Sequence, residues 1–269
     1  MSLESLFIRF TTVDSITFSF YLGIFMFISM AGTLLLKQRD VIREITKTSF
    51  PMLILCAILM GSSNIFFISA IKSTTVANVV IIFGTSALFA SLFAYFIYKE
   101  KVAKNILIAS FFMIIGLFII FNDKLGIGNM LGNIFAICCV STFSLGFVFL
   151  SKYTKMSRVA LTALTGICVA LISFILSDSI NVSLNTLATI AVMGLLITPI
   201  SRVLMGNGTK FISASEVSIL MIIETIMAPI WVWLFLNEIP STNTFIGGSI
   251  ILLTLIANSL YTLKKENIT

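Results

Sequence analysis

Residues 208–238 read GTKFISASEVSILMIIETIMAPIWVWLFLNE, and residues 70–100 read AIKSTTVANVVIIFGTSALFASLFAYFIYKE. The two segments align without a gap when residue 208 is set against residue 70, a shift of 138 residues. Lys72 then pairs with Lys210, and each segment continues through a short polar turn and an apolar run to a closing glutamate. Identical residues are sparse, but the plan is shared. We therefore predict that the chain contains two copies of one structural unit.

The composition indicates an integral membrane protein. The chain has 269 residues, of which 58% are hydrophobic and 10% charged, whereas soluble domains carry about 25% charged residues. Apolar runs of roughly 17 to 25 residues can cross a membrane as helices. A helix satisfies its own backbone N–H and C=O groups, which find no hydrogen-bond partners in lipid. Nine such runs occur, at about 16–36, 50–71, 76–98, 106–121, 130–150, 159–176, 187–205, 217–236 and 245–263. The predicted fold class is an all-α membrane protein.

The basic residues predict the orientation of the chain. All but three of the 17 lie in the connections on one side of the predicted bundle, the exceptions being Arg9, Lys72 and Lys124. The positive-inside rule makes the crowded side cytoplasmic, which places the C-terminus inside the cell and the N-terminus outside. The two copies then enter the membrane from opposite sides. Such inverted repeats are typical of secondary transporters, whose substrate site lies near the midplane where the repeats meet.

We divide the chain into a first repeat, 1–125, and a second repeat, 126–269. The second opens with a full span, MLGNIFAICCVSTFSLGFVFL, whereas the first opens with LFIRFTTVDS (6–15), which resembles only the tail of such a span. Two copies of five helices would give ten, and this chain supplies nine complete helices and the end of one. Three interpretations stay open: an upstream start, a shortened first repeat, or an inactive remnant.

Several segments together resemble a known family. The two five-helix inverted repeats, GNIFAICCVSTFSLGFVFLSK at the start of the second, and SASEVSILMIIETIMAPIWVWLFLNE near its end are similar to EamA-type transporters of the drug/metabolite transporter superfamily. The resemblance implies a ten-helix transporter of amino acids, other metabolites or drugs. The first repeat departs from the pattern, since many members have a proline in the fourth helix and this chain has none between Pro51 and Pro199.

Arg202 is a candidate for binding a substrate. It follows Pro199 by three residues in ITPISRVLMGNG, and proline leaves a backbone carbonyl of the preceding turn without its usual donor. Turned inward, its guanidinium would pair with Glu216 or with an anionic group of the substrate; turned outward, it would reach the membrane interface. The 138-residue shift pairs Arg202 with Asn64, which is also polar and within a span. This pairing predicts that both residues border one central cavity.

Five further residues on the opening stretch and its counterpart complete the predicted site. Glu216, which pairs with Asn78, stands near the start of its span, where helix capping is the alternative to substrate binding. Glu224, deeper in the membrane and paired with Ser86, is a candidate for binding an ammonium or exchanging a proton, with a carboxyl that holds helices together as the alternative. Trp231 lies on the same helix face as Glu224. An aromatic side chain beside a carboxylate suits a cationic or zwitterionic substrate.

Other classes of protein fit the sequence less well. The chain has no histidine, and its four cysteines lie in apolar runs without metal-ligand spacing, so we predict neither a metal nor a cofactor. The basic residues occur between spans and do not form a nucleic-acid-binding face. We therefore predict a multi-pass transporter of the cell membrane, not an enzyme, whose partners are the lipid bilayer and a small metabolite, with amino acids favoured, drugs second, and proton coupling left open.

Overall fold

A computed structural model describes residues 2–37, 50–99, 104–121, 130–153, 156–177, 179–208, 214–237 and 240–266. The side chains of residues 2, 205–222, 224, 265 and 266 fall outside this description. All regular elements in the described part are helices: α1 (Ser2–Phe10), α2 (Ser15–Lys37), α4 (Phe50–Ser73), α5 (Val76–Gly84), α6 (Ser86–Tyr98), α7 (Lys104–Phe121), α8 (Met130–Lys152), α9 (Arg158–Leu176), α10 (Leu184–Val192), η1 (Met193–Ile197), α11 (Thr198–Gly208), α12 (Ala214–Leu236) and α13 (Thr242–Glu266).

The helices confirm the predicted fold class. Eight helical stretches in the described part are long and apolar enough to cross a membrane. The ninth predicted span, 217–236, coincides with α12, of which Thr225–Leu236 is described as a shorter apolar helix. Large apolar side chains such as Phe118 and Leu253 lie exposed on the outer faces, as expected of a surface that meets lipid.

Two predicted spans differ from straight helices. The span 76–98 divides at Thr85 into α5 and α6, and the Thr85 hydroxyl donates to the Ile82 carbonyl at 2.6 Å. The span 187–205 contains a π-helical turn, η1, directly before Pro199. Proline cannot donate to the carbonyl four residues earlier, and the Leu195 carbonyl instead accepts from the Ser29 hydroxyl on α2 at 2.6 Å. A neighbouring helix thus pairs the backbone group that the proline leaves free.

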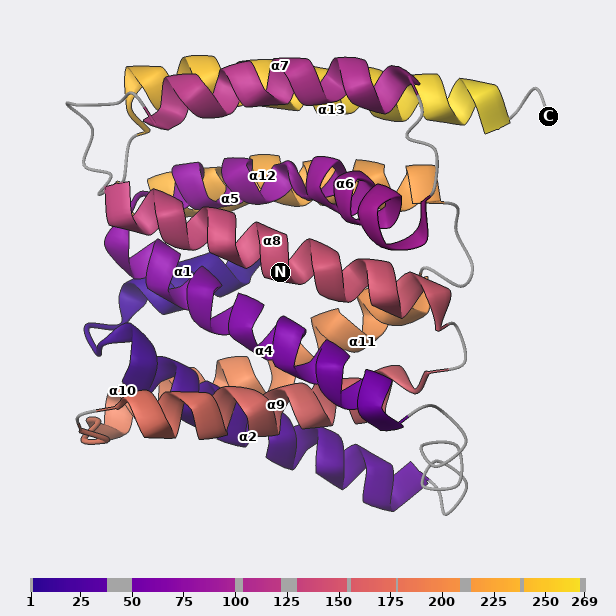
Figure 1. Cartoon of the computed structure of the whole chain (residues 1–269). Coiled ribbons are helices and arrows are strands. Elements are labelled where there is room, and N and C mark those ends of the chain that lie inside the picture. The colour runs from indigo at the N-terminus through magenta and orange to yellow at the C-terminus, as the bar shows by residue number, and fades with distance from the viewer. Residues whose placement is uncertain are drawn as a thin grey trace.

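The helices lie side by side in layers (Figure 1). At one edge α7 packs on α13, at the other α2 packs on α9, and α4 packs on α8 between them. The 138-residue shift carries α2 onto α9 and α7 onto α13, so each edge pairs a helix with its own repeat counterpart. Glycine permits these approaches: a Cβ on Gly23 would lie 2.6 Å from the Ala170 backbone nitrogen. Close contact at small residues is typical of helices packed in membranes.

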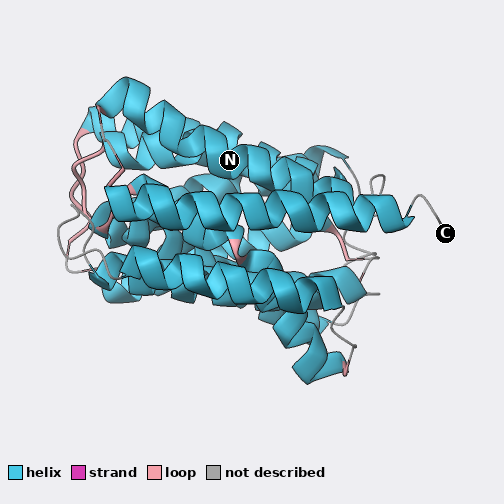
Figure 2. Ribbon diagram, turned by 90° about the horizontal axis from the view of Figure 1, so that it is seen from above, coloured by secondary structure: helices cyan, strands magenta, loops and turns pink. Residues whose placement is uncertain are grey.

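The connections gather at the two ends of the bundle (Figure 2). We call the end of the bundle at which α2, α6, α8, α11 and α13 end the basic end. At the opposite end, Arg9 donates to the Ile71 carbonyl at 2.9 Å and Lys72 donates to the Thr11 carbonyl at 2.6 Å. These bonds hold the end of α1 and the α1–α2 connection against the end of α4. Helix α1 reaches from that end into the middle of the bundle (Figure 1).

Candidate functional site

The predicted partners Asn64 and Arg202 meet directly. The Arg202 Nη2 donates to the Asn64 Oδ1 at 2.8 Å, although 138 residues separate them in the chain. The Asn64 Nδ2 in turn donates to the Met60 carbonyl at 3.0 Å, which fixes the amide so that its oxygen faces Arg202. A residue that touches its own repeat counterpart lies at the pseudo-twofold axis. The structure therefore places this pair at the centre of the molecule, where the two repeats meet.

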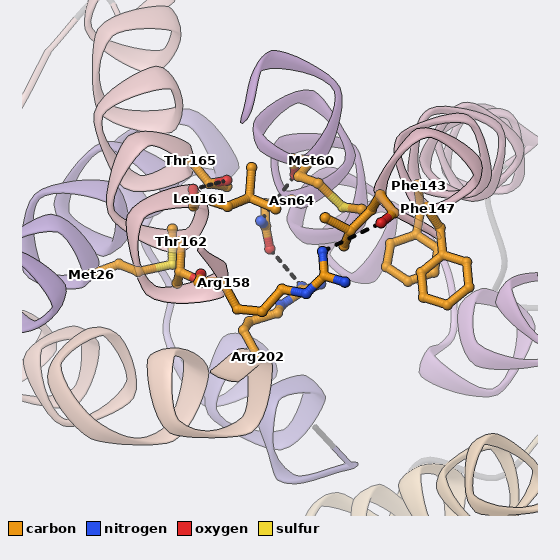
Figure 3. Close-up of a pocket in the computed structure, with 11 residues that line it drawn as sticks. Met26, Met60, Asn64, Phe143, Phe147, Arg158, Leu161, Thr162, Thr165 and Arg202 are labelled. Carbon is orange, nitrogen blue, oxygen red and sulfur yellow. Dashed lines mark hydrogen bonds between the residues drawn. The ribbon is translucent and has the colours of Figure 1, made fainter. Parts of the chain in front are cut away.

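The pair borders a cavity of about 60 Å³ that α2, α4, α8, α9 and α11 enclose (Figure 3). Its wall is largely apolar, with a few polar groups. The lining residues are Met26, Met60, Asn64, Phe143, Phe147, Leu150, Arg158, Leu161, Thr162, Thr165 and Arg202. Apolar walls with a small number of placed polar groups are typical of sites for small molecules.

Arg158 is a cavity residue that the sequence reasoning missed. It is the first residue of α9, after the N-cap Ser157, and it is 8% exposed. Its Nη1 makes a long bond of 3.5 Å to the Leu150 carbonyl, and its buried Nε has no hydrogen-bond partner among the described residues. In the sequence Arg158 stands among the basic residues of a connection, which suggests a position at the membrane surface. The signal that could have found it is its place directly after a capping serine, at the start of an apolar run.

Both guanidinium groups keep unused donors. Among the described residues, the buried Arg202 Nε lacks a partner, as the Arg158 Nε does. Each guanidinium has five N–H donors and no acceptor, and within that part of the chain each donates to one oxygen atom, the Leu150 carbonyl for Arg158 and the Asn64 amide for Arg202. The cavity therefore presents positive charge and free N–H groups, which suits an anionic ligand.

Glu4 is a second residue that the sequence reasoning missed. With Arg202 and Phe143 it lines a smaller cavity of about 10 Å³. Its side chain is 3% exposed and accepts a hydrogen bond from the Ser201 hydroxyl at 3.1 Å. Glu4 lies on α1, which is too short to be recognised as a membrane span, so its position at the bundle centre could not be inferred from hydropathy. Its carboxylate and the two guanidinium groups give this region charges of both signs.

Asn78 lies apart from the pair formed by Asn64 and Arg202. It is 2% exposed and lines neither cavity. Its Nδ2 donates to the Asn133 Oδ1 at 3.2 Å and to the Thr74 Oγ1 at 3.4 Å, and its Oδ1 accepts from the Thr244 hydroxyl. We call these four residues, Thr74, Asn78, Asn133 and Thr244, the asparagine cluster. The cluster joins the α4–α5 connection to α5, α8 and α13.

Ser86 and Trp231 lie outside both cavities. Ser86 begins α6, and its carbonyl accepts from the Ser144 hydroxyl of α8 at 3.0 Å. Trp231 is half-buried on α12, with its ring 6.2 Å from that of Phe235. The side chains of Glu216 and Glu224 fall outside the described residues, although their backbone belongs to α12. The predicted contact of Arg202 with Glu216 falls outside the description for the same reason.

The described residues offer no metal site. No group of three or more histidine, cysteine, aspartate or glutamate side chains lies close enough together in that part of the chain to hold a metal ion. The four cysteines are free thiols, and the buried Cys139 contacts the Ser63 hydroxyl at 3.4 Å. The polar groups that line the two cavities are guanidinium, amide, hydroxyl, carboxyl and thiol groups.

Comparison with known proteins extends this picture. The model of the EamA-like transporter family matches residues 2–122 and again residues 130–260. An uncharacterized transporter of Clostridium kluyveri is 27% identical over 229 residues, which cover 80% of this chain and 74% of that protein. The uncharacterized transporter YdfC of Bacillus subtilis is 25% identical over 174 residues, covering 61% of this chain and 56% of the relative.

A solved crystal structure has the same fold. It superposes with a TM-score of 0.70 over 98% of this chain and 94% of the other, at 14% sequence identity. The family match spans nearly the whole chain in two successive segments, and the membrane-spanning helices agree with it. The chain belongs to the EamA-like transporter family.

Proposed function

We propose that the chain is a secondary transporter of the cell membrane that moves a small metabolite by alternating access of two repeats, 1–125 and 126–269. The single observation that carries the proposal is the hydrogen bond between Asn64 and Arg202, repeat counterparts that meet at the wall of a central cavity. A site at the repeat interface can face either side of the membrane when one repeat rocks against the other. The excess of basic residues places the basic end, with the C-terminus, in the cytoplasm.

The charges favour an amino acid or a related metabolite as substrate. Arg202 offers N–H donors for a carboxylate, and Glu4, in the adjoining small cavity, offers an acceptor for an ammonium group. Glu224 remains a proposed second carboxylate on the neighbouring α12. The alternative is a cationic drug, which carboxylates and aromatic walls would favour. Both charged residues of the larger cavity are arginines, and this supports the metabolite over the cation.

The test is counterflow uptake by the purified full chain in proteoliposomes, with amino acids, nucleosides and cationic drugs as the panel. We expect counterflow of an amino acid or a closely related metabolite. A well-folded preparation that gives no counterflow with any compound would contradict the proposal. Turnover of a compound without flux would indicate a membrane-embedded enzyme instead.

Proton coupling is tested by Glu224→Gln. If Glu224 exchanges the coupling proton, the substitution abolishes the pH dependence of transport while counterflow at a fixed pH persists. The matched control is Asp14→Asn, which also removes one carboxylate but keeps the capping function, because asparagine caps helices as well as aspartate does. If Glu224→Gln leaves the pH dependence of transport unchanged, Glu224 does not carry the coupling proton. Glu4→Gln would then be the next variant to measure.

A further inference from the structure

Arg158 and Arg202 reach into the same cavity from α9 and α11 (Figure 3). We propose that they form a paired-guanidinium site for the oxyanion head group, a carboxylate or a phosphate, of a substrate that has an apolar body. This inference rests on the proposed transport function and specifies its substrate class: the molecule carried is an organic anion or a zwitterion bound through its anionic end. Arg158 then becomes a residue that contacts the substrate.

Both arginine side chains have N–H donors that lack a hydrogen-bond acceptor among the described residues. Arg158 is 8% exposed, its Nε is buried without a partner, and its recorded bond to the Leu150 carbonyl is long at 3.5 Å. Arg202 shares the buried, unpartnered Nε. Buried polar groups in native proteins are nearly always paired, and two unpaired donors on the side chains that border one cavity point to an acceptor that binds there.

Arg158 and Arg202 bring two positive charges to one cavity. A buried cation is costly in a membrane protein unless a partner offsets its desolvation. In the part of the chain that the structure describes, both guanidinium groups donate to neutral oxygen atoms, the Leu150 carbonyl and the Asn64 amide. Glu4, which lines the smaller cavity with Arg202, accepts from the Ser201 hydroxyl. A bound oxyanion would offset both charges at once and accept the charge-assisted bonds that guanidinium donates in pairs. A cationic ligand would meet repulsion from both residues.

The remaining wall of the larger cavity is mostly apolar. Apart from the two arginines, Asn64 and two threonines, the cavity is lined by apolar side chains. The hydroxyls of Thr162 and Thr165 already donate to carbonyls of their own helix, each at 2.8 Å. A cavity of about 60 Å³ with this lining fits a compact anionic group beside an aliphatic body and offers little to a polyhydroxylated one.

The experiment uses one apolar skeleton with different head groups. Binding of 4-methylpentanoate, leucine, 3-methylbutyl phosphate and 3-methylbutylamine to the purified full chain is measured by calorimetry, and the same compounds are tested in counterflow. We expect the three compounds that carry an oxyanion to bind and the amine not to bind. The relative affinity of 4-methylpentanoate and 3-methylbutyl phosphate decides between carboxylate and phosphate as the natural head group.

The variants assign the binding to the two arginines. Arg158→Gln and Arg202→Gln should each weaken binding of the oxyanions at least tenfold, and Arg158→Lys should restore part of it, since lysine keeps the charge but not the planar fork. The matched control is Lys152→Gln, which removes one positive charge from the same end of the bundle at an exposed side chain outside the cavity. Its affinity should equal that of the wild type. Thermal melting of each variant separates lost binding from lost folding.

The outcomes separate this inference from the proposed function. Oxyanion binding that Arg158→Gln abolishes, in a protein that shows no counterflow, would support the site and contradict transport. Counterflow of 3-methylbutylamine, or of any compound at the wild-type rate in both glutamine variants, would support transport and overturn the site. Failure of every oxyanion in the series to bind the folded wild-type protein would also overturn it.

Discussion

Two buried asparagines show how polar side chains differ in purpose within one bundle. Asn78 belongs to the asparagine cluster, where its amide bonds to Thr74, Asn133 and Thr244 and both its polar atoms have protein partners. Asn64 borders the larger cavity, where it bonds to an arginine whose Nε has no partner. Both are less than 10% exposed. Burial therefore does not distinguish them, whereas the pairing of the surrounding donors does.

The contrast has a physical basis. A cluster in which every member is bonded strengthens helix contacts, because the low local dielectric makes each bond stronger. Donors that are left partly unpaired lower the stability of the protein without ligand. Binding of a suitable acceptor pairs these donors and stabilises the complex. We therefore expect substitutions in the asparagine cluster to reduce stability and substitutions at the cavity to reduce transport. The predictions below test that separation.

The largest effect is expected at Gly132, which lets α8 approach the α4–α5 connection closely enough for Asn133 to join the cluster. A Cβ there would lie 2.6 Å from the Thr74 Cβ and 2.7 Å from the backbone of Ser73. Gly132→Val should lower the free energy of unfolding by about 3 kcal/mol, the upper part of the range for overpacking. Thermal melting measures it. Gly32→Val is the control, because no described atom beyond the glycine's own helical turn and chain neighbours lies within 4 Å of the corresponding Cβ.

Arg202→Gln should lower transport by roughly 10- to 100-fold, the equivalent of losing a hydrogen bond to a charged group worth about 1.5–3 kcal/mol. Its melting temperature should stay near that of the wild type, since the substitution removes a charge that the protein leaves incompletely paired. Initial rates of counterflow and a melting curve give the two values. A large loss of stability with transport per folded molecule unchanged would place Arg202 with the structural residues.

Asn78→Ala should show the opposite pattern. It leaves the Thr244 hydroxyl without its acceptor and removes a donor from Asn133, which should cost about 1–3 kcal/mol of stability. Transport per folded molecule should remain within about twofold of the wild type. Melting temperature and counterflow normalised to folded protein check the pair of values. Loss of transport without loss of stability would return Asn78 to the substrate site that the sequence predicted.

The smallest effect is expected at Asp14, the N-cap of α2, whose Oδ2 accepts from the Thr17 and Ile16 amides at 2.8 and 3.0 Å. Asp14→Ala should cost about 1 kcal/mol. Burial alone would raise the pKa of Asp14, but the hydrogen bonds from Thr17 and Ile16 outweigh it and hold the pKa below its ordinary value of 3.8. A lowered folded-state pKa stabilises the protein above pH 3.8, and this contribution is lost as the pH falls through the folded-state pKa.

The measurement is thermal melting of wild type and Asp14→Ala between pH 3 and pH 7. The difference in melting temperature between the wild type and Asp14→Ala should be largest at neutral pH and should shrink as the pH falls below 4. A difference that is independent of pH would show that the Asp14 charge contributes nothing to the cap.

The fold followed from the sequence because lipid restricts the chain to helices and the apolar runs are long. Part of the candidate site followed as well: the 138-residue shift paired Asn64 with Arg202, and the structure joins them by a hydrogen bond. Arg158 and Glu4 did not follow, because charge count and hydropathy locate residues along the membrane normal and carry no information about which way a side chain turns. The place of Asn78 in a bonded cluster depended on Asn133 and Thr244, which are distant in the chain.

The contact between Asn64 and Arg202 also says something about how two repeats can come to share one chain. In a symmetric dimer of identical five-helix subunits, a residue on the axis faces its own copy, so arginine would meet arginine and asparagine would meet asparagine. Neither pairing gives a charged donor bonded to a neutral acceptor at 2.8 Å. Two halves within one chain are free of that constraint, and at this contact one half contributes an asparagine and the other an arginine.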